Sequence, residues 1–292
     1  MSEDFGLKND QIIGGTYRII EPMSAGAFGT VYLAERLEDE LPVVVKALRQ
    51  DAKKGDPAAV ERFIREAAVA SNLDHPNIVR TLNFGQSRDG VLYIVLERLK
   101  GRTLAEAMFE DAVPIDVTSE VVCQMLRGLV VAHGQGLVHR DIKPSNVFVC
   151  EPEHRSAYGE IEGDTVKLLD FGFVKVLNKD SNFAKTITMA GFIVGTPGYI
   201  APEMLRYNKV SVLSDLYGVG VIGFELATGT QAFPGSGLER AFNQMSMDPK
   251  VPDGLDASDS RFELIAKLMA RDPAQRFQSA QEALDAFEAQ GS

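Results

Sequence analysis

The sequence predicts an α+β fold in which a strand-rich first part precedes a helix-rich second part. Up to about residue 98, short β-branched and apolar runs between turn residues predict antiparallel strands, with one helix among them. Beyond Lys100-Gly101, apolar residues at helical spacing replace the strands. The 292-residue chain is 45% hydrophobic and 24% charged, which is typical of a globular domain of this size.

The first part combines short strands with a single helix. The strand candidates cover residues 17–20, 30–34, 41–48, 77–84 and 91–96. Pro57 suits a first helical turn, and apolar residues from Val60 to Ala67 follow at helical spacing. The turn residues Asp74-His75-Pro76-Asn77 end this helix.

The second part is predicted to be mainly helical. Its helix candidates cover residues 118–134, 213–228, 261–270 and 279–289. Thr118 and Ser279 are the expected N-caps, and Glu282 stands at the capping-box position after Ser279. Residues 150–164, which are acidic, and residues 173–197 follow no periodic pattern and are expected to be functional or disordered loops.

Charge and cysteine content exclude several classes of protein. The net charge of −11, from 30 basic and 41 acidic residues, argues against coating of nucleic acid and against docking on anionic lipid by bulk charge. The two cysteines, Cys123 and Cys150, cannot form a disulfide framework. The most apolar run, 216–228, is broken by Glu225 and is too short to span a membrane. A cytoplasmic location is therefore expected, and an anchor outside residues 1–292 stays open.

A glycine turn and a lysine–glutamate pair are the first candidate functional features. Gly26 and Gly29 lie between two strand candidates, where small residues would let backbone N–H groups approach a polyphosphate; a plain hairpin turn is the alternative. Lys46 ends an apolar strand and needs a counter-charge, and Glu66 lies on the apolar side of the first helix. Together they predict an ion pair, although each residue alone fits a solvent-exposed position.

The run from His139 to Asn146 is the strongest chemical signal. Asp141 and Asn146 can orient a nucleophile and hold a divalent metal, and Lys143 can meet the charge of a transferring phosphate. Further along the chain, Asp170-Phe171-Gly172 follows a short apolar strand and suits a hard cation such as Mg²⁺.

These motifs resemble those of the eukaryotic-like serine/threonine protein kinases, particularly the bacterial ones. The resemblance runs from about Tyr17 to Phe287 and includes three further motifs. They are Gly195-Thr196-Pro197-Gly198-Tyr199-Ile200-Ala201-Pro202-Glu203, Ser214-Asp215-Leu216-Tyr217-Gly218 and Arg271-Asp272-Pro273-Ala274-Gln275-Arg276. The resemblance implies a bilobal protein kinase fold: an antiparallel β-rich N-lobe with one main helix, a mainly helical C-lobe and an ATP cleft between them.

The same resemblance implies one kinase domain over residues 1–292 and sets its internal boundaries. These are an N-terminal extension at 1–16, an N-lobe at 17–97, a C-lobe at 98–288 and an activation segment at 170–203. The implied activity is transfer of the γ-phosphoryl group of Mg·ATP to Ser/Thr hydroxyls of protein substrates, with autophosphorylation of the activation loop. Lys143 and Thr196-Pro197 match the Ser/Thr rather than the Tyr pattern.

The resemblance also assigns a role to individual residues. The implied nucleotide site consists of Gly26, Gly29, Val31, Val44, Lys46, Leu96 as gatekeeper, the backbones of Glu97 and Leu99, Phe148 and Asp170. The implied catalytic set consists of Asp141, which accepts or orients the substrate hydroxyl proton, Lys143, Asn146, Lys46 and Glu66. Asn146 and Asp170 would hold Mg²⁺, or Mn²⁺ in its place, and Glu203, Asp215 and Arg276 would be scaffold groups.

Regulation by phosphorylation of the activation loop is a further expectation. Arg140 would bind an activation-loop phosphate, with Lys175 beside it. The candidate phosphosites are Thr186 and Thr188, with Ser181 behind them. Self-association would allow one chain to phosphorylate another. The alternative is that these are ordinary loop hydroxyls.

Three positions depart from the family pattern. Ser24 replaces the first glycine of the glycine loop, and Val44 and Phe148 are larger than the usual residues around adenine. The fuller slot predicts a weakened or altered fit for the nucleotide. Residues 150–165 resemble an acidic insertion, expected to be a solvated surface loop or, alternatively, a docking element.

Two other functions stay open. A pseudokinase would use the same fold as a scaffold or nucleotide-gated switch. A small-molecule kinase of the aminoglycoside type shares an Asp…Asn loop but typically lacks the Ala201-Pro202-Glu203 pattern seen here. No nucleic-acid partner and no membrane contact of this segment are expected.

Overall fold

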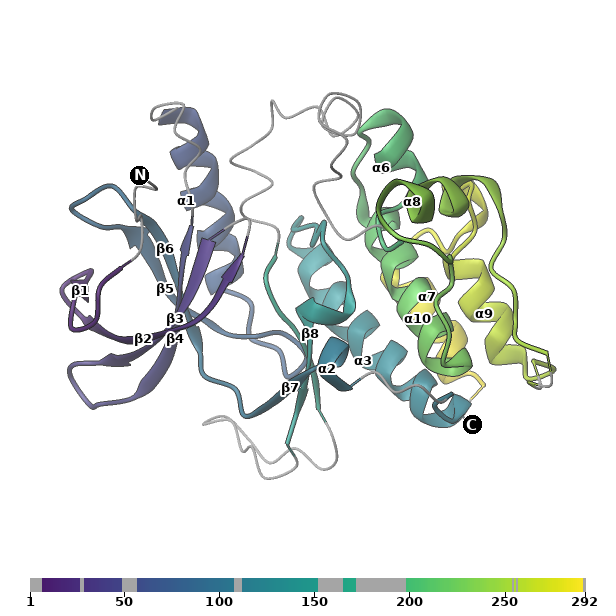
Figure 1. Cartoon of the computed structure of the whole chain (residues 1–292), viewed down its shortest axis with the longest axis horizontal. Coiled ribbons are helices and arrows are strands. Elements are labelled where there is room, and N and C mark those ends of the chain that lie inside the picture. The colour runs from purple at the N-terminus through teal and green to yellow at the C-terminus, as the bar shows by residue number, and fades with distance from the viewer. Residues whose placement is uncertain are drawn as a thin grey trace. The chain divides into compact units, whose positions relative to one another are not determined.

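The computed structural model describes residues 7–26, 29–48, 57–107, 112–151, 165–171, 198–253, 255 and 257–290, with side chains except at 57–59. The described chain forms two compact units. The first extends to His75 and resumes at Val79–Leu99. The second comprises Pro76–Ile78 and the described residues from Lys100 onward. Figure 1 shows a sheet with one helix in the first unit and a mainly helical second unit.

The first unit is built on a six-stranded antiparallel sheet with the strand order β1-β2-β3-β4-β6-β5. Its strands are β1 (Ile12–Ile13), β2 (Tyr17–Gly26), β3 (Gly29–Arg36), β4 (Pro42–Leu48), β5 (Thr81–Gln86) and β6 (Leu92–Glu97). Helix α1 (Pro57–Ser71) packs against β5. On one face of the sheet, Tyr32, Val45 and Val95 are direct cross-strand neighbours and are buried in the core of this unit. Because side chains alternate along a strand, the opposite face carries the intervening residues.

The turn between β2 and β3 requires glycine at one of its two glycine positions. Gly26 and Gly29 form the last cross-strand pair, and Gly29 has a φ of +152°. A Cβ atom on Gly29 would lie 2.1 Å from the carbonyl oxygen of Ala47, which is a severe clash with backbone. A Cβ atom on Gly26 would have its nearest neighbour at 3.9 Å, which is ordinary contact.

Gly29→Ala is therefore expected to lower the free energy of unfolding by about 1–3 kcal/mol, because β3 and β4 must separate to admit the methyl group. Gly26→Ala is the matched control and is expected to change it by less than about 0.5 kcal/mol. Urea unfolding followed by circular dichroism measures both midpoints at constant slope. Equal midpoints for the two variants would show that the close approach to Ala47 does not constrain this turn.

The second unit consists of helices around a buried central helix and one small sheet. Its helices are α2 (Leu104–Ala107), α3 (Ile115–Gly134), α6 (Pro202–Tyr207), α7 (Val212–Thr228), α8 (Gly237–Ser246), α9 (Ser260–Leu268) and α10 (Ala280–Glu288), with 3₁₀ turns η1 (Pro144–Asn146) and η2 (Pro273–Gln275). The small antiparallel sheet comprises β7 (Gly101–Thr103), β8 (Val147–Cys150) and β9 (Val166–Leu168). Every residue of α7 from Ser214 onward is buried, and α3 and α9 pack against it (Figure 1). This all-round burial explains why most residues of α7 are apolar.

Two helix starts differ in how well the sequence predicts them. Thr118 is not an N-cap: α3 begins at Ile115 after Pro114, and Thr118 is buried inside the helix. The prediction was wrong because the first turn of α3 carries no cap side chain that a sequence pattern could reveal. The Ser279 cap is confirmed, since its Oγ accepts a hydrogen bond from the backbone N–H of Glu282 at 3.1 Å.

The strand predicted at 77–84 is shorter than expected, because its first residues belong to the second unit. β5 begins at Thr81, whereas Ile78 forms a parallel bridge with Leu168. The buried Asn77 amide donates to the carbonyl oxygen of Val166 at 2.8 Å. The polar side chain thus fixes Asn77 to β9 instead of to the strand that follows it.

The architecture confirms the α+β prediction and the strand-rich to helix-rich order of the chain. The short elements β1, β7, β8, α2 and α6 were not singled out from the sequence, because too few residues show a period. The ten-residue helix α8 was also missed. Among the described helices, none is both long and apolar enough to cross a membrane.

Candidate active site

The backbone of the loop that begins at His139 is held by one buried carboxylate. Asp215, on α7, accepts hydrogen bonds from the backbone N–H groups of His139 and Arg140, both at 2.8 Å. The Nε2 of His133, on α3, donates to the same carboxylate at 2.9 Å. Arg140 has a φ of +69°, in a left-handed region that side chains other than glycine rarely adopt. The Asp215 carboxylate therefore stabilises a strained backbone directly before Asp141.

The buried His139 side chain connects this loop to the segment that carries Asp170. Its Nε2 lies 2.6 Å from the carbonyl oxygen of Leu169, which can only accept, so Nε2 carries the proton. Its Nδ1 accepts from the backbone N–H of Asp141 at 3.4 Å. Burial lowers the pKa of His139 and keeps the ring neutral. The ring also packs on Phe171, with centroids 4.8 Å apart.

Asp141, Lys143 and Asn146 form one cluster of charged and polar side chains. The Lys143 Nζ lies 2.8 Å from Oδ2 of Asp141. The Asn146 Nδ2 donates to the same Oδ2 at 2.9 Å and to the backbone oxygen of Asp141 at 2.8 Å. The 3₁₀ turn η1 brings Asn146 back toward Lys143 and Asp141, because the backbone N–H of Asn146 donates to the carbonyl oxygen of Lys143 at 2.9 Å. The carboxylate is thus fixed in position by a cation and an amide.

Asn146 and Asp170 supply oxygen atoms suited to a divalent cation. The Asn146 side-chain amide faces the backbone oxygen and Oδ2 of Asp141, which are both acceptors. The Nδ2 of Asn146 must therefore point at Asp141, and the Oδ1 of Asn146 must point away. No hydrogen bond from the described part of the chain reaches that Oδ1. The backbone N–H of Leu169 donates to the backbone carbonyl oxygen of Asn146 at 2.8 Å. This bond holds the residue before Asp170 against Asn146. Amide and carboxylate oxygens are the ligands that Mg²⁺ takes in proteins, so this pair fits the metal.

In the first unit, four of the residues assigned to a nucleotide share one face of the sheet. Val31 lies opposite Lys46, and Lys46 lies opposite Ile94. Val44 lies two residues before Lys46 on β4, and its partner on β6 is Leu96, two residues after Ile94. Direct antiparallel partners project to the same side, so these side chains form one surface on the face opposite the core. Val31, Val44 and Lys46 are half-buried, as expected of a surface that a ligand can cover.

The segment after β6 offers backbone groups for hydrogen bonding. The Glu97 N–H donates to the carbonyl oxygen of Arg80 at 3.0 Å, and the Glu97 carboxylate accepts from the Arg80 N–H at 2.9 Å. Leu99 has no backbone hydrogen bond within the described ranges. The amide and carbonyl of Leu99 are therefore available to a heterocycle with its own donors and acceptors.

Glu66 and Phe148 lie in different units. Glu66 is half-buried on α1 and follows the buried Phe63 by about one turn. Its ion pair with Lys46 stays a prediction. Phe148 is half-buried on β8 of the second unit, opposite Thr103.

Glu203 and Arg276 form a buried, two-pronged ion pair. The Nη1 and Nη2 atoms of Arg276 each lie 2.9 Å from a different oxygen of Glu203. The guanidinium also donates to the carbonyl oxygens of Ala270 at 2.7 Å and Leu213 at 2.8 Å, and Ser214 Oγ donates to Glu203 at 3.0 Å. The pair thus joins α6 to the first turn of α7 and to the segment after α9.

A second buried network lies where the described chain resumes after residue 197. Tyr199 donates its hydroxyl to Glu225 at 2.5 Å, and Arg240 lies 2.6 Å from the same carboxylate. Burial raises the pKa of both Glu225 and Tyr199. The network connects this segment to α7 and α8.

Sequence reasoning missed several of these partners. His133 is 82 residues from Asp215, and no short-range pattern could reveal that contact. The same holds for Tyr199 and Glu225. The predicted regulatory residues Lys175, Ser181, Thr186 and Thr188 lie outside the described residues, as does most of the predicted activation segment at 170–203.

Comparison with known proteins gives a consistent result. The family model described as the protein kinase domain matches residues 17–287. Serine/threonine-protein kinase pkn3 of Myxococcus xanthus is 36% identical over 283 residues, which is 93% of this chain and 50% of that protein. Serine/threonine-protein kinase PrkC of Bacillus subtilis is 32% identical over 281 residues, which is 92% of this chain and 40% of that protein.

Solved structures show the same fold. The kinase domain of Mycobacterium tuberculosis PknI, as a double mutant, matches with a TM-score of 0.73 at 24% identity, covering 99% of this chain and 100% of that chain. The chain spans about half or less of the length of the two relatives above. The family model covers nearly all of this chain. The bilobal kinase fold is therefore confirmed, and the chain belongs to the protein kinase domain family.

Proposed function

We propose that this chain transfers the γ-phosphoryl group of Mg·ATP to serine and threonine hydroxyls of protein substrates. The observation that carries the proposal is the cluster of Asp141, Lys143 and Asn146, tied through Leu169 to Asp170. Such a cluster supplies a hydroxyl-orienting carboxylate, a cation for phosphate charge and two metal-binding oxygens. The relatives named as serine/threonine-protein kinases support the same reaction.

In the proposed mechanism, the Asp141 carboxylate orients the substrate hydroxyl and accepts its proton. The hydroxyl oxygen forms a bond to the γ-phosphorus while the bond from that phosphorus to ADP breaks, and ADP leaves. Lys143, already 2.8 Å from Asp141, offsets the negative charge of the transferring group. Asn146 and Asp170 would hold Mg²⁺, which neutralises phosphate charge when bound. Most of the rate acceleration then comes from positioning and charge stabilisation, because the protein makes no covalent bond in this transfer.

The nucleotide would bind the face of the first unit's sheet that carries Val31, Val44 and Lys46. Lys46 would contact the α- and β-phosphates, with Glu66 as its partner. Val31 and Val44 would cover the adenine, and the Leu99 backbone would hydrogen-bond its edge. Phe148, in the second unit, would be a further adenine contact. Gly26 and Gly29 would cover the phosphates.

Regulation and domain limits are part of the proposal. Residues 17–97 would form the N-lobe and 98–288 the C-lobe, after an extension at 1–16. Arg140 would bind a phosphate on the activation loop, added by a second copy of the chain. This segment would work in the cytoplasm, since its two cysteines are free.

A peptide assay tests the reaction directly. Three peptides that differ only in carrying Ser, Thr or Tyr are incubated with the protein and radiolabelled ATP, in Mg²⁺ and in excess chelator. Label is expected on the Ser and Thr peptides in Mg²⁺ and on none in chelator. Label on the Tyr peptide alone would contradict the Ser/Thr assignment, and nucleotide binding without label on any peptide would favour a pseudokinase.

A further inference from the structure

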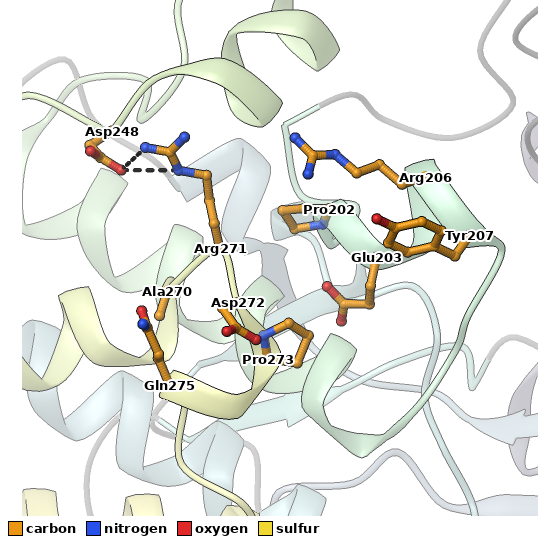
Figure 2. A pocket seen from close by; sticks show the side chains of 10 residues that line it. All are labelled: Pro202, Glu203, Arg206, Tyr207, Asp248, Ala270, Arg271, Asp272, Pro273 and Gln275. Carbon is orange, nitrogen blue, oxygen red and sulfur yellow. Dashed lines mark hydrogen bonds and ion pairs between the residues drawn. The ribbon is translucent and has the colours of Figure 1, made fainter.

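A large pocket lies in the second unit beside the ion pair of Glu203 and Arg276. Its volume is about 620 Å³, which is within the range of ligand-binding sites. Its lining comes from three separate segments: α6, the residue Asp248 after α8, and the segment that includes η2. Figure 2 shows the side chains of Arg206, Arg271 and Asp248 along one side of the pocket. None of these residues belongs to the Asp141 cluster.

Two arginines give one rim of the pocket its chemical character. Arg206 donates to the carbonyl oxygen of Met245 at 3.1 Å and has no ion pair within the described ranges. Arg271 pairs with Asp248 at 2.6 Å, as drawn in Figure 2. Met245 and Asp248 are three residues apart, so their Cα atoms lie within about 11 Å of each other. One ligand can therefore reach both guanidinium groups.

The acidic residues of the pocket compete only weakly for an anion. The Asp248 side chain is 81% exposed, and ion pairs at such a position are weak. Glu203 is already neutralised by Arg276 at 2.9 Å. The carboxylate of Asp272 keeps its negative charge, and one of its oxygen atoms accepts from the backbone N–H of Ala274 at 3.0 Å. The guanidinium of Arg206 keeps most of its five N–H donors for a ligand.

The pocket wall also suits a peptide rather than a bare ion. Tyr207 is 73% exposed, and the half-buried Pro273 adds apolar surface to the same pocket. An aromatic ring and a proline next to arginines can pack against an extended backbone while the cations hold its acidic side chains.

The pocket lies on the opposite side of α6 from the reacting groups. A small cavity of about 10 Å³ is lined by Asp141, Lys143 and Met204 of α6. The larger pocket is lined by Pro202, Arg206 and other residues of the same helix. A helix with its side chains is about 10–12 Å across, and an extended chain advances about 3.3 Å per residue. An extended substrate chain would therefore need at least about three to four residues to cover the width of this helix.

We propose that this pocket docks an anionic segment of the protein substrate, at least about three to four residues from the phosphorylated hydroxyl. The inference rests on the proposed kinase function, and it names a class of substrate for it. The shared chemistry is a cluster of anionic side chains, which glutamates or earlier phosphorylated serines can supply. A docked segment increases the effective concentration of the acceptor hydroxyl at Asp141 without contact with the reacting atoms.

A peptide series tests the proposal. Each peptide carries one acceptor serine and three glutamates, placed at increasing distances on either side; a neutral peptide carries glutamines instead. With the wild type, KM is expected to be about tenfold lower than for the neutral peptide at one spacing, with kcat unchanged. Arg206→Ala and Arg271→Ala are expected to remove that advantage. A phosphoserine version of the best peptide shows which anion binds more tightly.

Matched variants exclude indirect effects. Arg88→Ala removes an exposed arginine that does not line the pocket and is expected to change nothing. Arg206→Glu is expected to prefer a peptide with lysines in place of the glutamates, which a merely misfolded variant would not do. Equal KM values for acidic and neutral peptides in the wild type would overturn the proposal.

A binding assay separates this proposal from the proposed reaction. Fluorescence anisotropy of a labelled acidic peptide requires no turnover. Binding that is lost in Arg206→Ala supports the docking site even if no peptide is phosphorylated. Normal phosphorylation of the neutral peptide, together with no selective binding of the acidic one, overturns the docking site and leaves the kinase function intact.

Discussion

Replacing Asp141 with asparagine is expected to lower kcat by about 10²–10⁴-fold on a serine peptide. Asparagine keeps the shape of the side chain but cannot accept the hydroxyl proton or carry the negative charge that Lys143 neutralises at 2.8 Å. The affinity for ATP is expected to stay within about twofold, because Asp141 acts on the acceptor. Steady-state kinetics and a nucleotide-binding titration measure the two quantities.

The control for Asp141→Asn is the same substitution at an exposed position. Asp89→Asn changes the same net charge in a surface turn and is expected to leave kcat within about twofold of the wild type. A full loss of ATP binding in Asp141→Asn would show that the residue supports the nucleotide site instead. An unchanged kcat would remove Asp141 from the mechanism.

Removing the Arg276 side chain is expected to lower the free energy of unfolding more than the Gly29→Ala substitution does. Arg276→Ala would leave Glu203 charged and buried, and breaking a buried ion pair in this way costs about 3–5 kcal/mol. The guanidinium also satisfies the carbonyl oxygens of Ala270 and Leu213, which would lose their donor. Urea unfolding measures the free energy at constant slope.

A double substitution distinguishes the ion pair from simple loss of packing. Glu203→Gln with Arg276→Met removes both charges and is expected to be less destabilising than the sum of the two single changes. Arg276→Lys is expected to recover only part of the stability, because one ammonium cannot bridge both oxygens of Glu203. Strict additivity in this cycle would mean that the two side chains are not coupled.

How far the sequence predicts the site depends on how close the residues are in the chain. Asp141, Lys143 and Asn146 lie within six residues, so a local pattern indicates their cluster, and η1 supplies the geometry. Glu203 and Arg276 are 73 residues apart, and only the family resemblance suggested that both are scaffold groups. The partnership of His133 with Asp215 had no sequence signal.

The fold shows a similar division between local and tertiary causes. The apolar residues predicted the long helices α3 and α7: burial of one side of α3 leaves a helical period, and burial of α7 on all sides leaves a long apolar run. The true start of α3 depends on packing of the preceding turn rather than on a cap residue, so Thr118 was the wrong choice. The need for glycine at position 29, but not at 26, follows from the Ala47 carbonyl on the neighbouring strand.

The docking pocket could not be predicted from sequence at all. Arg206, Asp248 and Arg271 come from three distant segments, and each alone has the composition of an ordinary surface position. Only the folded chain brings Met245 and Asp248 next to both arginines.

Mass-spectrometric mapping of phosphosites tests the central claim most directly. Wild type and Asp141→Asn are incubated with Mg·ATP and a serine-containing protein, and both the enzyme and the added protein are analysed. We expect phosphate on serine or threonine residues with the wild type only, including the activation-loop residues Thr186 or Thr188. Phosphate at the same sites and levels with Asp141→Asn as with the wild type would contradict the proposed function. The absence of phosphate from both the wild-type chain and the added protein would also contradict it.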